Sequence, residues 1–317
     1  GIGGQVGAWM AILLMKRGYV VNATSRDRVA SIFANLKRLG LFEQARLHSA
    51  VLSDFRCVVQ VIGDVRPDEI YNLAGQSSVG LSFEQPVETL NSIILGTVNI
   101  LEAIRFLGLA ARFYNASSSE CFGNTGHLPA DEGRAFHPRS PYGVGKAAAY
   151  WAIANYRESY NLFACSGILF NHESELRPAR YVTQKIVRGA ADIAEGKTDV
   201  LRLGELSISR DWGWAPEYVD AMWRMLNHDT PEDFVIATGQ AYPLEAFVHA
   251  AFDYFGLNWR QHVESDAALL RPSDIAVSVG DPGKAKRQLN WEAETKMPGV
   301  VAKLLDAETR RRRAAQA

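Results

Sequence analysis

The sequence has no excess of charge of either sign. Its 317 residues include 34 basic and 35 acidic side chains, for a formal net charge of −1. A nucleic-acid-binding domain ordinarily carries a basic face, so this balance predicts no nucleic-acid partner. The one basic run, Arg310 to Arg313, lies at the C-terminal end of the chain. We interpret it as a solvated helix end, where cations interact favourably with the helix dipole, rather than as a binding patch.

Cysteine is scarce as well. Cys57, Cys121 and Cys165 are odd in number and far apart, which excludes a disulfide framework. The seven histidines show no metal-ligand spacing, so no metal is expected. No apolar run approaches the roughly 20 residues that cross a bilayer, and no signal peptide is visible. We therefore expect a reduced, cytoplasmic protein with no membrane partner.

The sequence does contain a regular alternation of helix and strand patterns. Apolar residues recur at helical spacing from Val6 to Leu14, Gly18 ends that helix, and a short strand is predicted at 19–23. Further helices are predicted at 30–39, 55–65, 91–107 and 141–159, and further strands at 51–52, 69–74, 111–116 and 164–170. This alternation predicts an α/β fold with a Rossmann-like, doubly wound parallel sheet that is covered on both faces.

The sequence pattern changes after about residue 170: the predicted loops lengthen, and tryptophans and arginines cluster. We expect residues 1–170 to form a dinucleotide-binding domain and 171–317 mainly a smaller substrate-binding domain, with some segments returning to the first. No repeat or Pro/Gly linker separates them, so they should form one compact body. A doubly wound fold places a strand before its glycine turn, and this sequence starts on the first glycine. We therefore expect the first strand to be missing and the sequence to be a fragment.

A glycine pattern opens the chain, with Gly1, Gly4 and Gly7 ahead of the first helix. Such glycines allow the backbone to turn tightly and approach a pyrophosphate at the helix N-terminus. Alone, the pattern also fits an ordinary glycine turn. The helix and strand that follow favour a dinucleotide site.

Arg26 follows the second predicted strand, where dinucleotide folds contact the adenosine ribose. An acidic residue there favours NAD, whereas an arginine accommodates the 2′-phosphate of NADP. Arg26 therefore favours NADP, although its spacing also fits an exposed loop arginine.

Three side chains in the middle of the chain indicate proton-transfer chemistry. Ser118 ends a predicted strand, and Tyr142 and Lys146 lie one turn apart on a helix. A cation near a phenol favours the phenolate, so Tyr142 is a candidate base near neutral pH. On its own, a Tyr-x-x-x-Lys pair is ordinarily a pair on the surface of a helix. Its place after two strands of a dinucleotide fold favours a catalytic pair instead.

With these residues in this order, the chain resembles the extended short-chain dehydrogenases that act on nucleotide sugars, and most closely the GDP-mannose 4,6-dehydratase family. The resemblance runs from Gly1 to about Glu308. It is carried by the runs 71–79, 138–143, 156–158, 167–174, 182–186, 210–213 and 232–239. The Phe-Asn-His-Glu-Ser run at 170–174 and the Arg-Asp-Trp-Gly run at 210–213 are its most specific parts.

The resemblance implies roles for individual residues. Ser118 takes a catalytic position, Glu120 is the acid/base, Tyr142 removes a proton and Lys146 assists it. Without the resemblance, Glu120 would be a solvated loop carboxylate. The implied cofactor contacts are Gly1, Gly4, Gly7, Arg26, Leu52, Leu73, Ala74, Tyr142, Lys146, His172 and Arg177. The implied substrate contacts are Ser77, Asn171, Lys185, Arg210 and Arg271. The loop 173–180, with Arg177, is similar to a segment that reaches a neighbouring subunit's cofactor, which implies a homodimer or homotetramer.

The chain departs from the family at two positions near the cofactor. The family commonly has Gly-Asp-Leu where this chain has Ala50-Val51-Leu52, so a hydrogen bond to adenine is expected to be lost. The glycine turn has Val6 where the family has Asp. Neither change touches the expected chemistry.

The implied reaction converts GDP-mannose to GDP-4-keto-6-deoxymannose by internal hydride transfer through NADP and elimination of water. A related nucleotide-sugar dehydratase and a 4-keto reductase are the nearest alternatives. A non-catalytic dinucleotide-binding protein is a further alternative, but such proteins often lose the Tyr or Lys that this chain retains.

Overall fold

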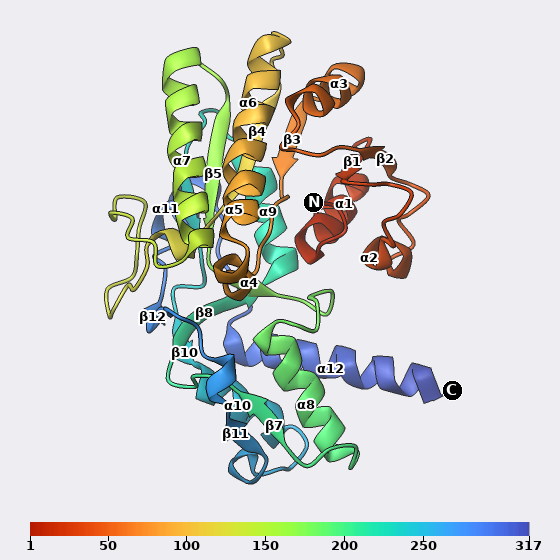
Figure 1. The fold of residues 1–317 in the computed structure, drawn as a ribbon, viewed down its shortest axis with the longest axis vertical. Helices are drawn as coiled ribbons and strands as arrows, with labels where there is room; N and C mark the ends of the chain where they lie inside the picture. The colour runs from red at the N-terminus through yellow and green to blue at the C-terminus, as the bar shows by residue number, and fades with distance from the viewer. Residues whose placement is uncertain (317) are drawn as a thin grey trace.

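A four-stranded parallel sheet forms the core of the upper part of the molecule in Figure 1. The computed structural model describes residues 1–316. The strands in spatial order are β3 (Glu69–Asn72), β4 (Arg112–Ser118), β5 (Ala164–Leu169) and β9 (Phe234–Ile236). Each neighbouring pair is parallel, which confirms the predicted fold class.

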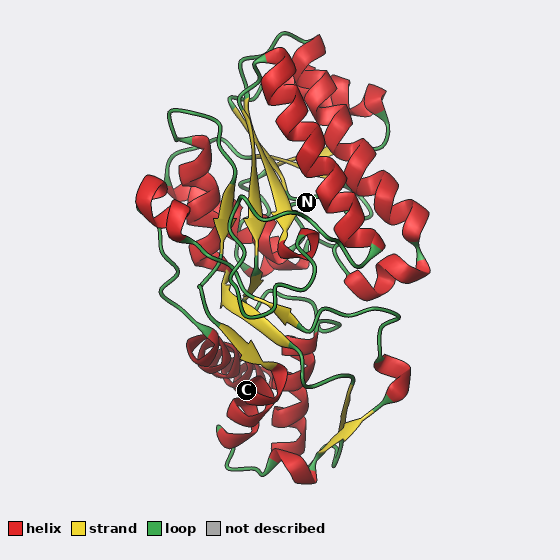
Figure 2. Ribbon diagram, turned by 90° about the vertical axis from the view of Figure 1, so that its left-hand side faces the viewer, coloured by secondary structure: helices red, strands yellow, loops and turns green. Residues whose placement is uncertain are grey.

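Both faces of this sheet are covered by helices, as Figure 2 shows from the side. Successive side chains of a strand point to opposite faces, so Phe113 and Tyr114 enter two different apolar clusters. One layer is formed by α3 (Phe55–Val65), α6 (Gly96–Phe106) and α7 (Pro141–Tyr160). The other is formed by α1 (Gln5–Lys16), α9 (Ala215–Leu226) and α11 (Gly283–Leu289). Burial on two faces explains why the strands are rich in apolar residues.

A separate two-stranded parallel sheet lies beside α1 and α2 (Ala34–Arg38). It consists of β1 (Asn22–Ser25) and β2 (Arg46–Ser49). The predictions here were displaced: the first strand lies at 22–25 rather than 19–23, and residues 51–52 are not a strand. The ladder ends where the Ala50 amide donates to the Ser25 carbonyl at 2.8 Å. Val51 then begins the turn that leads into α3.

The helix predicted at 91–107 starts earlier than expected. Three segments follow without a gap and form one continuous helix: α5 (Pro86–Leu90), a π-helical turn at Asn91–Leu95, and α6. The 21 residues of Pro86–Phe106 are long and apolar enough to cross a bilayer, contrary to the prediction that no such stretch exists. Half of the most apolar window is buried inside the protein, where α6 packs on α3 and the sheet. This packing is that of a core helix.

The lower part of the molecule is built on a second apolar cluster. Its helices are α8 (Val182–Ala194), α10 (Leu244–Asp253) and α12 (Met297–Gln316). Its strands are β6 (Asn171–Glu173), β7 (Leu201–Leu203), β8 (Ser209–Trp214), β10 (Ala241–Pro243), β11 (Val263–Ser265) and β12 (Val277–Ser278). Strand β8 is central, because it pairs with β6, β10 and β12.

The basic run near the C-terminus is not simply a solvated helix end. The side chain of Arg312 is only 11% exposed and forms ion pairs with Glu308 on α12 and with Asp192 and Glu195 around the end of α8, each at 2.8 Å. The earlier interpretation is therefore wrong for Arg312, because two of the three carboxylates around it, Asp192 and Glu195, are distant in sequence. Arg312 joins α12 to α8.

Candidate active site

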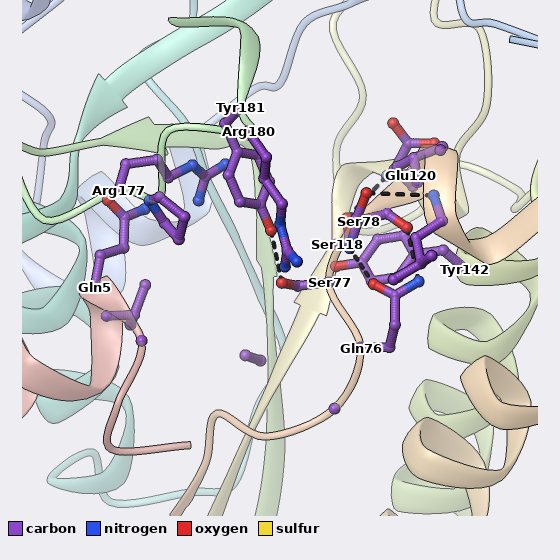
Figure 3. Close-up of a pocket in the computed structure, with 18 of the residues that line it drawn as sticks. Gln5, Gln76, Ser77, Ser78, Ser118, Glu120, Tyr142, Arg177, Arg180 and Tyr181 are labelled. Atoms are coloured by element: carbon purple, nitrogen blue, oxygen red, sulfur yellow. Dashed lines mark hydrogen bonds between the residues drawn. The ribbon is translucent and has the colours of Figure 1, made fainter. Parts of the chain in front are cut away.

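A single cleft of about 1440 Å³ lies at the carboxyl ends of the strands, between the upper and lower parts. Ligands of open α/β sheets bind at this edge. The structure brings all predicted site residues to its lining, namely Gly1, Gly4, Gly7, Arg26, Leu52, Leu73, Ala74, Ser77, Ser118, Glu120, Tyr142, Lys146, Asn171, His172, Arg177, Lys185, Arg210 and Arg271. Figure 3 shows part of the cleft, with Glu120 and Tyr142 on one side and Arg177 and Tyr181 on the other.

The backbone of the glycine turn packs tightly, both against the segment after β3 and against itself. A Cβ at Gly1 would lie 2.1 Å from the carbonyl oxygen of Leu73, and a Cβ at Gly7 would lie 2.4 Å from that of Gly1. Neither position admits a side chain. At Gly4, the N-cap of α1, the nearest atom would be 3.5 Å away, so packing does not require glycine there. The turn leaves backbone amides at the N-terminus of α1 facing the cleft, the arrangement that suits a pyrophosphate.

Arg26 follows β1 directly and is exposed at the edge of the cleft. Within residues 1–316 its guanidinium has no hydrogen bond or ion pair, whereas the guanidinium of Arg28 donates to the Leu47 carbonyl at 3.3 Å. The parallel register of β1 and β2 places Arg26 beside the segment that carries Leu52. The carbonyl of Leu52 is fixed by the Asn99 side-chain amide at 2.8 Å, and its side chain packs over Gly96.

Two capping serines position the catalytic candidates. Ser140 is the N-cap of α7 and accepts from the Gly143 amide at 3.0 Å, and Pro141 occupies the first helical position. Tyr142 therefore sits in the first turn of α7. Ser118, the last residue of β4, accepts from the Glu120 amide at 3.3 Å. Each bond shapes its own segment, the turn after β4 and the first turn of α7.

Glycine at position 143 allows this close approach. A Cβ there would lie 2.8 Å from the carbonyl oxygen of Glu120 and 3.1 Å from Pro138. The turn that carries Glu120, a 3₁₀ turn at Ser119–Cys121, packs directly on the start of α7.

Burial and hydrogen bonding act on the pKa of Tyr142 in opposite directions. Burial raises the pKa of Tyr142 above its ordinary value, and the bond with the Ser118 hydroxyl lowers it by less. The Lys146 ammonium, 5.7 Å from the centre of the Tyr142 ring, donates instead to the Ala116 carbonyl at 2.6 Å. Desolvation therefore opposes the ionisation of Tyr142 that a neighbouring cation favours.

Lys146 is itself affected by its surroundings. It is 7% exposed, and burial lowers its pKa to about 8. The backbone carbonyl of Ala116 on β4 is its hydrogen-bond acceptor. Its ammonium is therefore held 5.7 Å from the centre of the Tyr142 ring.

Glu120 is a carboxyl group in a desolvated position. Burial raises its pKa above the ordinary value of 4.5, while the positive charges of Arg210 and Arg271 act in the opposite direction. A raised pKa is typical of carboxyl groups that exchange protons during catalysis.

The two arginines share a carboxylate that the sequence interpretation missed. Arg210, on β8, is 5% exposed, and its Nη2 donates to Oδ1 of Asp274 at 2.8 Å. Nη1 of Arg271 donates to the same oxygen at 3.4 Å. The available signal was the spacing of Arg271 and Asp274, three residues apart in one loop, but their link to Arg210 depends on tertiary structure.

The opposite wall consists of β6 and the loop before α8. The Nδ1–H of His172 donates to the Phe170 carbonyl at 2.8 Å, and burial lowers the pKa of His172 to about 4, so the ring is neutral. Nε of Arg177 lies 3.2 Å from Oε2 of Glu173, a buried carboxylate of the same chain. The Arg177 guanidinium also lies 4.1 Å above the ring of Tyr181.

Tyr181 was not predicted, yet it connects the two walls. Its hydroxyl lies 2.8 Å from that of Ser77, which follows β3. Asn171 begins β6 and Lys185 lies in the first turns of α8 on the same side of the cleft, and Leu73 and Ala74 follow β3 on the other. Within the described residues 1–316, no group of three or more His, Cys, Asp or Glu side chains forms a metal site.

Comparison with known proteins identifies relatives over nearly the whole chain. The family model described as GDP-mannose 4,6 dehydratase matches residues 1–304. The chain is 40% identical to GDP-mannose 4,6 dehydratase 2 of Arabidopsis thaliana, with 97% of this chain and 85% of that protein covered. It is 39% identical to the Homo sapiens GDP-mannose 4,6 dehydratase, with 97% and 90% covered.

Solved structures share the fold at lower sequence identity. A UDP-glucose 4-epimerase from Thermotoga maritima with UDP-glucose has a TM-score of 0.85 at 22% identity, covering 99% of this chain and 98% of that one. RMD from Pseudomonas aeruginosa complexed with NADPH has a TM-score of 0.78 at 21% identity, covering 97% and 96%.

Proposed function

The chain belongs to the GDP-mannose 4,6-dehydratase family, and on that premise we propose how its cleft converts GDP-mannose to GDP-4-keto-6-deoxymannose with loss of water. One observation carries the proposal: Ser118, Glu120 and Tyr142 meet where β4 ends and α7 begins, with Lys146 one turn below. These are the acid/base groups that the reaction needs, in one desolvated place.

Tyr142 accepts the proton of the hydroxyl on carbon 4. Ser118 hydrogen-bonds the same oxygen, since its hydroxyl already interacts with the phenol. To accept this proton Tyr142 must be ionised, and Lys146 stabilises that phenolate because its ammonium is fixed 5.7 Å from the centre of the ring. When bound, NADP would supply the hydride chemistry that oxidises carbon 4 and later reduces carbon 6.

Glu120 performs the elimination. Once carbon 4 is a ketone, the proton on carbon 5 is acidic enough for a carboxylate to remove. The protonated Glu120 then gives this proton to the hydroxyl that leaves carbon 6 as water. When carbon 6 is reduced, carbon 5 takes up a proton that exchanges with solvent, and the release of the proton held by Tyr142 balances it. A pKa raised by burial suits a group that must take up and release a proton in one cycle. A 4-keto reductase needs no such carboxylate.

Several residues that line the cleft fit a dinucleotide. The turn at Gly1 and Gly7 leaves no room for side chains, which suits a pyrophosphate at the N-terminus of α1. Leu52, Leu73, Ala74 and His172 would line the remainder of this site. Arg26, with a free guanidinium at the end of β1, supports NADP over NAD because it can pair with the 2′-phosphate. Arg26→Ala should weaken NADP⁺ binding far more than NAD⁺ binding in calorimetry, and equal weakening would contradict this role.

Ser77 and four residues after position 170 supply the substrate contacts. Arg210, Arg271 and Lys185 present positive charge to the GDP diphosphate, and Asn171 and Ser77 present hydrogen-bonding groups. In this proposal residues 1–170 mainly bind the cofactor and residues 171–317 mainly the substrate. The working form is proposed to be a homodimer or homotetramer, with the loop 173–180 near a neighbour's cofactor. Sedimentation of a fully active monomer would contradict that assembly.

Product analysis tests the function directly. GDP-mannose incubated with the protein and catalytic NADP⁺ should lose one water, detected by mass spectrometry, without net formation of NADPH. Consumption of NADPH with a keto-sugar, and no dehydration of GDP-mannose, would indicate a reductase instead.

A further inference from the structure

The Asp274 carboxylate lies between the guanidinium groups of Arg210 and Arg271, which both bind it. Its Oδ1 accepts three hydrogen bonds, from Arg210 Nη2 at 2.8 Å, from Arg271 Nη1 at 3.4 Å and from the Ile275 amide at 2.8 Å. The last of these fixes the carboxylate on its own backbone. The other two make it the common anchor of guanidiniums from β8 and from the loop before β12.

Arg210 has little freedom to move away from this anchor. Its side chain is 7% exposed, and Nη1 donates to the carbonyls of Ile275 at 2.6 Å and of Ser209 at 3.0 Å. Arg271 is different, since its side chain is 36% exposed and its one described ion pair is the longer bond to Asp274. The carboxylate therefore binds one buried cation and one partly exposed cation.

Four charged side chains meet in this part of the cleft. Arg210, Arg271 and Asp274 all act on the pKa of Glu120, so all four lie within one electrostatic neighbourhood. Without Asp274, two like charges would face each other with one of them buried, which is costly. With it, the three side chains carry a net charge of +1, and both guanidiniums are held at the lining of the cleft. A dianionic diphosphate that enters would find the donors already in place.

We propose that Asp274 is a positioning residue that holds Arg210 and Arg271 as one preformed diphosphate site. This rests on the proposed function, in which the cleft binds GDP-mannose. Asp274 acts through the two arginines and not on the reacting carbon atoms, so it is not a catalytic residue.

Calorimetry with GDP and, separately, with NADP⁺ tests the proposal on the full chain. Asp274→Asn should weaken GDP binding about 10-fold, the effect of losing hydrogen bonds between charged groups, and should leave NADP⁺ binding unchanged. Asp274→Glu should restore part of the loss. At saturating GDP-mannose the turnover should change little while KM rises. Glu264→Gln is the matched control, because it removes an exposed arginine partner, that of Arg202, in the same part of the molecule but outside the cleft.

The outcomes separate three cases. Unchanged GDP binding in Asp274→Asn would overturn the proposal. Equal losses for GDP and NADP⁺, or an equal loss in the control, would also overturn it, because Asp274 would then serve the fold in general. Failure of the unaltered protein to bind GDP would contradict the proposed function itself, a result distinct from either of these.

Discussion

At the scale of single residues, the difference between oxidation and dehydration depends on Glu120. Glu120→Gln keeps the size of the side chain and removes its ability to accept a proton. Loss of a positioned acid/base typically lowers the rate about 10²–10⁴-fold, so we expect dehydration of GDP-mannose to fall in that range. Incorporation of solvent deuterium at carbon 5 should be lost as well, measured by mass spectrometry or NMR.

Tyr142→Phe is the matched comparison for that experiment. It should block the first hydride transfer, so no NADPH absorbance appears at all. If Glu120→Gln dehydrated at the normal rate with normal deuterium uptake, another group would be the base.

The raised pKa of Glu120 predicts a pH dependence. As a base, Glu120 must be ionised, so turnover at saturating substrate should fall as the pH decreases through its pKa. Because burial raises that pKa, the fall should begin above the range of an exposed glutamate. Arg271→Gln removes a charge that lowers the pKa, so it should move this limb to higher pH. A limb that does not move in Arg271→Gln would mean that another group titrates.

At the scale of elements, the site depends on how closely the Ser119–Cys121 turn packs on α7. Gly143→Ala would place a Cβ 2.8 Å from the Glu120 carbonyl, and backbone must shift to relieve the contact. We expect a loss of about 1–3 kcal/mol in the free energy of unfolding, as in other overpacked sites, and a loss of turnover. Urea denaturation measures the first effect.

Gly63→Ala in α3 provides the control for that substitution. Its nearest neighbours would be Leu107 methyl groups at 3.7 and 3.8 Å, an ordinary contact. Alanine is also the better helix former, so the change should be neutral or stabilising. Equal destabilisation by both variants would mean that the contact with Glu120 is unimportant.

Helix and strand patterns predicted most elements of residues 1–170 and none of those that follow, and the failures have physical causes. The helix at 55–65 was placed correctly because Asp54 caps it through two backbone amides and its apolar face is regular. Strand β2 was misplaced because it has only one partner, and a half-exposed strand carries polar residues that give no apolar run. The π-helical turn shifted the phase of the long helix, so its first turn at Pro86 was missed.

The predicted site residues came mainly from family motifs, and the structure adds what motifs do not contain. The spacing of Tyr142 and Lys146 was visible in the sequence, but the Ala116 carbonyl that binds Lys146 was not, since any residue supplies a carbonyl. Asp274 was missed because its partner Arg210 is distant in sequence.

At the scale of the whole molecule, ion pairs of Arg312 connect α12 to α8 in the lower part. Glu308 and Arg312 are both largely buried, and Asp192 and Glu195 complete the network. Arg312→Ala should lower the free energy of unfolding by about 2 kcal/mol, the effect of losing hydrogen bonds to charged groups. Arg310→Ala should change it by less than about 0.5 kcal/mol, as is usual for exposed positions. Thermal or urea unfolding of the two variants measures the difference, and equal effects would show that the network adds nothing to stability.

The path of the chain between the two parts has a consequence for how such enzymes diversify. After β6, α8 and β8 the chain returns to the upper part as α9 and β9, goes down again as β10 and α10, returns as α11 and ends below as α12. Each half is therefore encoded by several separated stretches of the gene. Recombination that exchanges one contiguous stretch would divide both halves at once. New sugar specificities in this lineage would then arise by successive point mutations along the cleft, inherited together, and not by the transfer of a ready-made substrate module.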